Sequence, residues 1–309
     1  VMVVVTVLLL TELKHTFTEF AQRMKNDEMI TLAKFLAISG IILPMLPHKN
    51  LIPDVNLTPY SIWLATVVVS GISYLSYLLK RYVFHESGTL VSGIIGGLYS
   101  STATISVLAR KSRKASEQEA TDYVAAMLLA ISMMFLRFMI LILIFSREIF
   151  LSIYPYLLTM AVVAAIVAWF IHSRQKRSND QPVEEEEDDS SNPLEFKVAL
   201  IFAVLFVIFT FLTHYTLVYA GTGGLNLLSF VSGFSDITPF ILNLLQNTGS
   251  VAALIITACS MQAIISNIMV NMFYALFFAG KGSKLRPWIL GGFGVVIACN
   301  LVLLLFFYI

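Results

Sequence analysis

Apolar runs of about 20 residues recur along this chain, and they restrict its fold more than any other feature of the sequence. A helix of about 20 residues crosses the hydrocarbon core of a bilayer, which is about 30 Å thick. The chain is 58% hydrophobic and only 13% charged, whereas a soluble domain is about 25% charged. The sequence therefore predicts an all-α polytopic membrane protein in contact with the lipid bilayer. The expected uninterrupted spans are 29–47, 61–80, 122–145, 149–172, 196–219, 250–279 and 286–309.

Two further apolar segments, 89–109 and 224–245, contain residues that weaken a helix. The first includes the stretch Gly93–Thr104 (GIIGGLYSSTAT), and the second includes Ser229–Pro239 (SFVSGFSDITP). Gly, Ser, Thr and Asp disfavour a helix interior, and Pro removes a backbone donor. Irregular backbone at membrane depth survives only where protein or a water-filled cavity satisfies its polar groups. We therefore interpret these segments as the lining of a solute path, with close helix packing through small side chains as the alternative.

The distribution of basic residues indicates how these segments cross the membrane. Basic loops prefer the cytoplasmic face. If every apolar segment crossed fully, the second and third basic clusters would lie on opposite faces. If 89–109 and 224–245 each enter and leave on one face, all five clusters become cytoplasmic, which favours two re-entrant segments. The clusters are Lys14/Arg23/Lys25, Lys80/Arg81, Arg110/Lys111/Arg113/Lys114, Arg174/Lys176/Arg177 and Lys281/Lys284/Arg286.

The interrupted segments belong to an internal repeat. Gly97 and Gly233 lie 136 residues apart, and the same offset carries the span that starts near Ser61 onto Lys197. Each half then contains one helix, one interrupted segment and two more helices. With re-entrant segments each half crosses the membrane three times, so the halves have opposite orientations. This is the inverted-repeat plan of many secondary transporters, whereas fully spanning segments would give parallel repeats.

The repeat gives a domain plan for the chain. Residues 1–10 are apolar but too short to cross a bilayer, so we expect the chain to begin inside an earlier span. The acidic run Glu184–Asp189 is typical of a disordered, solvated linker, with a divalent-ion sensor as the alternative. The expected regions are a connector (1–28), an extra helix and exterior loop (29–60), repeat 1 (61–172), the linker (173–192) and repeat 2 (193–309).

Several motifs together resemble the domain of unknown function 4010 family, over about residues 30–309. In bacterial proteins this family follows an MgtC/SapB-like membrane segment, so the resemblance implies that residues 1–28 are the tail of such a segment. It also implies a bacterial inner (plasma) membrane protein, without an established activity. Family members often carry a second Asp where this chain has Thr238, which puts in doubt any role that needs two carboxylates there. The motifs are Gly93–Thr104, Met134–Arg137 (MFLR), Asn192–Lys197 (NPLEFK), Ser232–Asp236 (SGFSD) and Ser266–Asn267.

Charged residues inside the apolar segments are the strongest site candidates. Arg137 lies about ten residues, or roughly 15 Å, from the exterior end of its span. A charge at that depth is usually paired or faces water, and snorkelling to the membrane surface is the alternative. Asp236 is the only carboxylate of the second interrupted segment, and Pro239 behind it fits an N-cap of a half-helix. We expect Arg137 and Asp236 to approach each other near the solute path.

Polar residues complete the predicted path. Ser260, Asn267 and Asn271 share one face of a long helix, where they either bond to other helices or line a cavity. The predicted path consists of Gly96, Gly97, Ser100, Ser101, Thr102, Thr104, Arg137, Gly233, Ser235, Asp236, Thr238, Asn267 and Asn271.

No sequence motif indicates an enzyme, a cofactor or nucleic-acid binding. The chain lacks a phosphate-binding loop, a nucleophile elbow, a His/Cys metal pattern and a basic–aromatic surface. Cys259 and Cys299 lie inside spans, so we expect them to be packing residues and not a disulfide. A metal-binding role is left open.

The function expected from these patterns is a secondary transporter or channel-like permease for a small ion or polar solute. The sign of the solute's charge is open, because half-helix N-termini favour anions whereas Asp236 favours cations. The MgtC/SapB association alone points to divalent-cation handling. The alternative is a non-transporting regulatory or scaffolding membrane protein, and either protein is compatible with a homo-oligomer.

Overall fold

The regular secondary structure is helical in the part of the chain that this structure, a computed structural model, describes, apart from one isolated bridge between Ile52 and Val55. It describes residues 26–52, 55–84, 88–113, 115, 117–174, 196–246, 251–280 and 285–308. In this part, eight helices are long and apolar enough to cross a membrane. These confirm the prediction of an all-α polytopic membrane protein. They are Glu28–Met45, Pro59–Tyr82, Thr89–Lys111, Ala120–Phe145, Arg147–Ser173, Val198–Ser232, Ala253–Ala279 and Arg286–Leu305.

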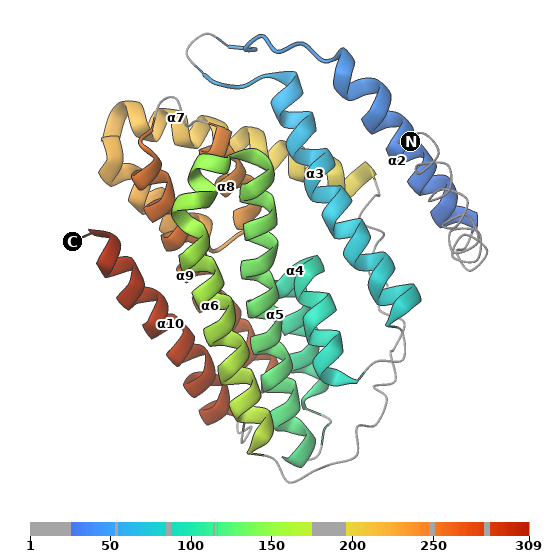
Figure 1. Cartoon of the computed structure of the whole chain (residues 1–309), viewed down its shortest axis with the longest axis vertical. Coiled ribbons are helices and arrows are strands. Elements are labelled where there is room, and N and C mark those ends of the chain that lie inside the picture. Colours follow the sequence, from blue (N-terminus) through green and yellow to red (C-terminus); the bar gives the residue numbers. More distant parts are fainter. Residues whose placement is uncertain are drawn as a thin grey trace, which may run out of the picture. The chain divides into compact units, whose positions relative to one another are not determined.

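The chain forms two compact units that divide between Leu46 and Pro47. The first unit contains α2 (Asn26–Met45), which corresponds to the expected span 29–47. In the second unit, α5 and α6 run side by side and α10 lies along α6 (Figure 1). The most buried span is α9. The helices of the second unit are α3 (Pro59–Leu78) with the π-helical turn η1 (Leu79–Val83), α4 (Thr89–Lys111), α5 (Glu117–Phe145), α6 (Arg147–Ser173), α7 (Phe196–Ser232), α8 (Ile237–Gln246), α9 (Ala253–Ala279) and α10 (Arg286–Tyr308).

The helix α4 is broken at Ser100, where the backbone is extended (φ −157°, ψ 105°). A Cβ atom placed on Gly96 would lie 2.5 Å from Thr104 Oγ1. Residues eight apart in a straight helix are separated by about 12 Å along the axis, so the two halves of α4 fold back on each other (Figure 1). Ser100 Oγ accepts a hydrogen bond from the Ala103 N–H at 3.3 Å and caps the second half, 101–111.

The second interrupted segment is also divided into two half-helices. The helix α7 first breaks at Gly221, whose positive φ of 60° glycine adopts without strain. Residues 233–236 then separate the half-helix 222–232 from α8. Asp236 Oδ1 accepts a hydrogen bond from the Thr238 N–H at 2.9 Å and caps α8. The two capping residues, Ser100 and Asp236, are 136 residues apart in the sequence.

The same offset relates one further pair of helices and one close contact. α5 begins at residue 117 and α9 begins 136 residues later, at residue 253. A Cβ atom on Gly97 would lie 2.5 Å from Ala130 Cα. A Cβ atom on Gly233 would overlap Ser266 Cβ and lie 2.8 Å from the Asn267 nitrogen. Ala130 and Ser266 are again 136 residues apart, so each broken segment packs on its long helix through an equivalent glycine.

We expect Gly97→Ala and Gly233→Ala each to lower the thermal unfolding midpoint of the purified protein in detergent. The added methyl group meets backbone or Cβ atoms, and overpacking of this kind costs about 1–3 kcal/mol. Gly291→Ala is the matched control, since Gly291 lies within α10, is exposed and has no atom within 4 Å of the added Cβ. Equal midpoints for all three variants would contradict the close contacts.

We also expect Asp236→Ala to destabilise the protein, whereas Asp236→Asn keeps its stability. Alanine cannot accept the Thr238 N–H bond, and loss of an N-cap costs about 1 kcal/mol. Asparagine caps a helix as well as aspartate does, so it removes the charge without removing the cap. Thermal unfolding of the two variants checks this prediction, and it fails if both variants unfold at the same temperature.

Candidate functional site

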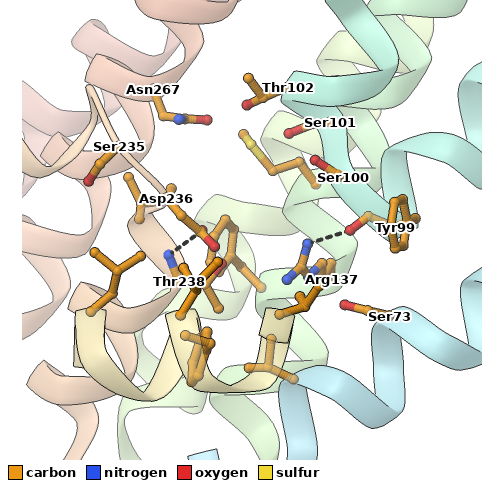
Figure 2. Close-up of a pocket in the computed structure, with 18 of the residues that line it drawn as sticks. Ser73, Tyr99, Ser100, Ser101, Thr102, Arg137, Ser235, Asp236, Thr238 and Asn267 are labelled. Atoms are coloured by element: carbon orange, nitrogen blue, oxygen red, sulfur yellow. Dashed lines mark hydrogen bonds between the residues drawn. The ribbon is translucent and has the colours of Figure 1, made fainter. Parts of the chain in front are cut away.

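The break at Ser100, called the first break, and the break at residues 233–236, called the second break, both open into one cavity of about 410 Å³ in the second unit (Figure 2). This volume lies within the range of about 300–1,000 Å³ that is usual for small-molecule sites. Residues from α3, α5, the first part of α7 and α9 complete the wall. The lining consists of Val69, Ser70 and Ser73 (α3), Tyr99–Thr102 (α4), Met134, Arg137 and Phe138 (α5), Val198, Ile201, Phe202 and Leu205 (α7), Phe234–Thr238 (the break and the start of α8), and Asn267, Val270 and Tyr274 (α9).

Arg137 projects from α5 to the α4 break. Its Nη1 donates a hydrogen bond to the Tyr99 carbonyl oxygen at 2.8 Å (Figure 2). Tyr99 is the last residue before the break, and carbonyls in the last turn of a helix lack a partner within the helix. The Arg137 Nε is buried and has no hydrogen-bond partner within the described part of the chain. The side chain therefore reaches the cavity, and not the membrane surface as the snorkelling alternative requires.

Asp236 lies across the cavity from Arg137 in Figure 2. One carboxylate oxygen is held by the Thr238 N–H, so the predicted N-cap geometry is present. Both residues are described in the structure, and neither a hydrogen bond nor an ion pair joins their side chains. The cavity thus contains two opposite charges that are separated from each other.

Asn267 holds the second break in the way that Arg137 holds the first. Its Nδ2 donates a hydrogen bond to the Gly233 carbonyl oxygen at 3.2 Å. Its Oδ1 accepts a hydrogen bond from Asn271 Nδ2 at 3.1 Å, one helical turn along α9. Asn267 is therefore fixed on both sides while its side chain borders the cavity.

The structure brings eight of the thirteen predicted path residues into this lining and leaves five outside it. Gly97 and Gly233 are used for packing against α5 and α9, and Gly96 packs against Thr104. Asn271 donates a hydrogen bond to the Asn267 side chain. The eight lining residues are Ser100, Ser101, Thr102, Arg137, Ser235, Asp236, Thr238 and Asn267, and the five outside are Gly96, Gly97, Thr104, Gly233 and Asn271.

Some lining residues were not among the predicted ones. Ser70 and Ser73 lie three residues apart on α3, a spacing that places two hydroxyls on one helix face. Tyr274 lies seven residues after Asn267 on α9, so the helical repeat places it on the same face. Both patterns are visible in the sequence as polar positions at helical spacing within an apolar span.

Metal-binding groups are not gathered in this part of the chain. Among the described residues, no cluster of three or more His, Cys, Asp or Glu side chains is placed to hold a metal ion. Cys259 and Cys299 are both free thiols. The acidic run 184–189, for which an ion sensor was the alternative prediction, lies outside the described residues.

Comparison with known proteins agrees with the resemblance seen in the motifs. Residues 67–279 match the model of the family described as domain of unknown function (DUF4010). An uncharacterized protein of Aquifex aeolicus (strain VF5) is 25% identical over 224 residues, which are 72% of this chain and 96% of that relative. No solved structure matches the chain. The protein is a multi-pass membrane protein that belongs to the DUF4010 family.

Proposed function

We propose that this protein is a secondary transporter or channel-like permease for a small ion or polar solute, and that the cavity between the two helix breaks is its solute site. The observation that carries the proposal is that both breaks, far apart in the sequence, open into the same cavity. Discontinuous helices that meet at such a site are the usual construction of secondary transporters. The proposal includes that the protein moves its solute without catalysing a chemical reaction.

The proposal includes an inverted repeat with two re-entrant segments. The fold-back of α4 at Ser100 supports a segment that enters and leaves the membrane on one face. The recurrence of helix starts, caps and the Gly97 and Gly233 contacts at one offset supports a duplicated half. Three crossings in each half then give opposite orientations, as in the inverted-repeat secondary transporters.

Other expectations from the sequence stay predictions. They concern an MgtC/SapB-like segment in the first residues, a link to divalent-cation handling, a homo-oligomer and a bacterial inner-membrane location. The Aquifex relative supports a bacterial origin for the family, without an activity that could be carried over.

Thiol labelling of single cysteines in a Cys259→Ala/Cys299→Ala background tests the membrane topology of α4 and the access of water to the cavity. Thr89→Cys and Ala115→Cys mark the two ends of α4, and Thr102→Cys and Ser235→Cys lie in the cavity. We expect the two end thiols to react with a membrane-impermeant maleimide from the same face only, because a re-entrant α4 returns to its starting face. The two cavity thiols should react as well, because a solute path contains water.

Ala130→Cys is the matched dry control, since Ala130 is fully buried where α5 packs on α4. Labelling of the two end thiols from opposite faces would overturn the inverted repeat. Cavity thiols that are as unreactive as the Ala130→Cys control would contradict the transport proposal and would favour the scaffolding alternative.

A further inference from the structure

We infer that the solute site takes a small zwitterion, whose anionic group binds Arg137 and whose cationic group binds Asp236. This inference rests on the proposed function and names its substrate class. It starts from the charges of the cavity. Among its lining residues Arg137 and Asp236 are the two formally charged side chains, and they have opposite signs.

Each of the two charged groups is anchored on one side and open on the other. Arg137 uses one guanidinium nitrogen for the Tyr99 carbonyl, and its buried Nε has no hydrogen-bond partner in the described residues. Asp236 uses one carboxylate oxygen for the Thr238 N–H. The anchored contacts fix the direction of both groups, and both residues line the cavity in which a ligand between them would lie.

The helix ends at the breaks do not change this charge balance. Each break places the negative end of one half-helix beside the positive end of the next, so the two partial charges offset each other. The exposed carbonyls of Tyr99 and Gly233 are already bonded to Arg137 and Asn267. The first amides of the following half-helices are capped by Ser100 and Asp236. The formal charges therefore decide which ligand fits.

A ligand with a single charge would fit this site poorly. An anion on Arg137 would leave Asp236 without a counter-charge, and a cation on Asp236 would leave Arg137 without one. Such a ligand makes one charge-assisted contact where a zwitterion makes two, and contacts of this kind are the stronger ones. A zwitterion compensates both charges at once and leaves the occupied cavity electrically neutral, which favours its passage through an apolar membrane.

The remaining wall indicates a ligand with a short apolar body. Hydroxyl groups cluster at the breaks and on α3, where they are available to the polar ends of the ligand. Apolar side chains of α5, α7 and α9 form another part of the wall. A cavity of about 410 Å³ has room for a solute of amino-acid size. The apolar residues that these three helices contribute are Met134, Phe138, Val198, Ile201, Phe202, Leu205 and Val270.

The test compares zwitterions with their own half-molecules on the purified full chain in lipid nanodiscs, by isothermal titration calorimetry. The zwitterions are alanine, valine, leucine and γ-aminobutyrate, the last with a wider charge separation. Each is paired with the carboxylate that lacks the amine (propionate, 3-methylbutanoate, 4-methylpentanoate, butyrate). Each is also paired with the amine that lacks the carboxylate (ethylamine, 2-methylpropylamine, 3-methylbutylamine, propylamine).

We expect at least one zwitterion to bind about 10- to 100-fold more tightly than both of its half-molecules, because each half-molecule loses a hydrogen bond to a charged group. Asp236→Asn keeps the α8 cap, so it should abolish the preference for the zwitterion over the carboxylate and retain the preference over the amine. Arg137→Gln should have the reverse effect. Arg137→Lys keeps the charge and should retain the zwitterion preference even if Arg137→Gln fails to fold.

Two matched controls carry the same changes of charge outside the cavity. Arg147→Gln and Glu148→Gln alter exposed residues in the first turn of α6, and both should bind with the wild-type ratios. If no zwitterion binds more tightly than its half-molecules, or if the two cavity variants keep the wild-type ratios, the inference is wrong. If, in every set, a half-molecule binds as tightly as its zwitterion, the substrate class alone is refuted. Dry cavity thiols in the labelling experiment refute the transport proposal itself.

Discussion

A helix that is broken inside a membrane protein leaves backbone groups without their helical partners, and the rest of this structure depends on how they are satisfied. Here side chains perform that task on both sides of each break. Ser100 and Asp236 accept hydrogen bonds from the free amides, and Arg137 and Asn267 donate to the free carbonyls. All four residues also line the cavity. The groups that stabilise the breaks are therefore the groups that a solute would meet.

The two broken segments of the second unit share several backbone features, but their side chains differ at the site. The glycine contacts and the capping positions recur, yet the cap is Ser100 in one half and Asp236 in the other. The position equivalent to Arg137 is Phe273, which is 62% exposed. The two charges therefore come from different segments, Arg137 from α5 and Asp236 from the break before α8. A site with both charges exists only where these segments meet.

The sequence predicts much of the fold, since the length of an apolar run and the positions of Gly, Ser and Pro act locally. The spans, the two interruptions and the cap at Asp236 follow from such local rules. The direction of a side chain depends on tertiary packing, which local rules do not contain. Asn271 and Tyr274 both follow Asn267 at helical spacing, and Tyr274 is the one that lines the cavity. Small residues such as Gly97 suit a solute path or a helix contact equally well, and only the position of Ala130 decides between them.

The short helix α8 has a consequence for how the protein is made. Its ten residues span about 15 Å, half the thickness of the hydrocarbon core, and residues 237–245 are all buried. It contacts α3, α5 and α7, which precede it in the chain, and α9, which follows it. During translation α8 is therefore made before α9, the last helix that packs against it. A segment of this length does not span the bilayer on its own. The cavity is completed only after α9 has entered the membrane, which makes it a late product of biogenesis.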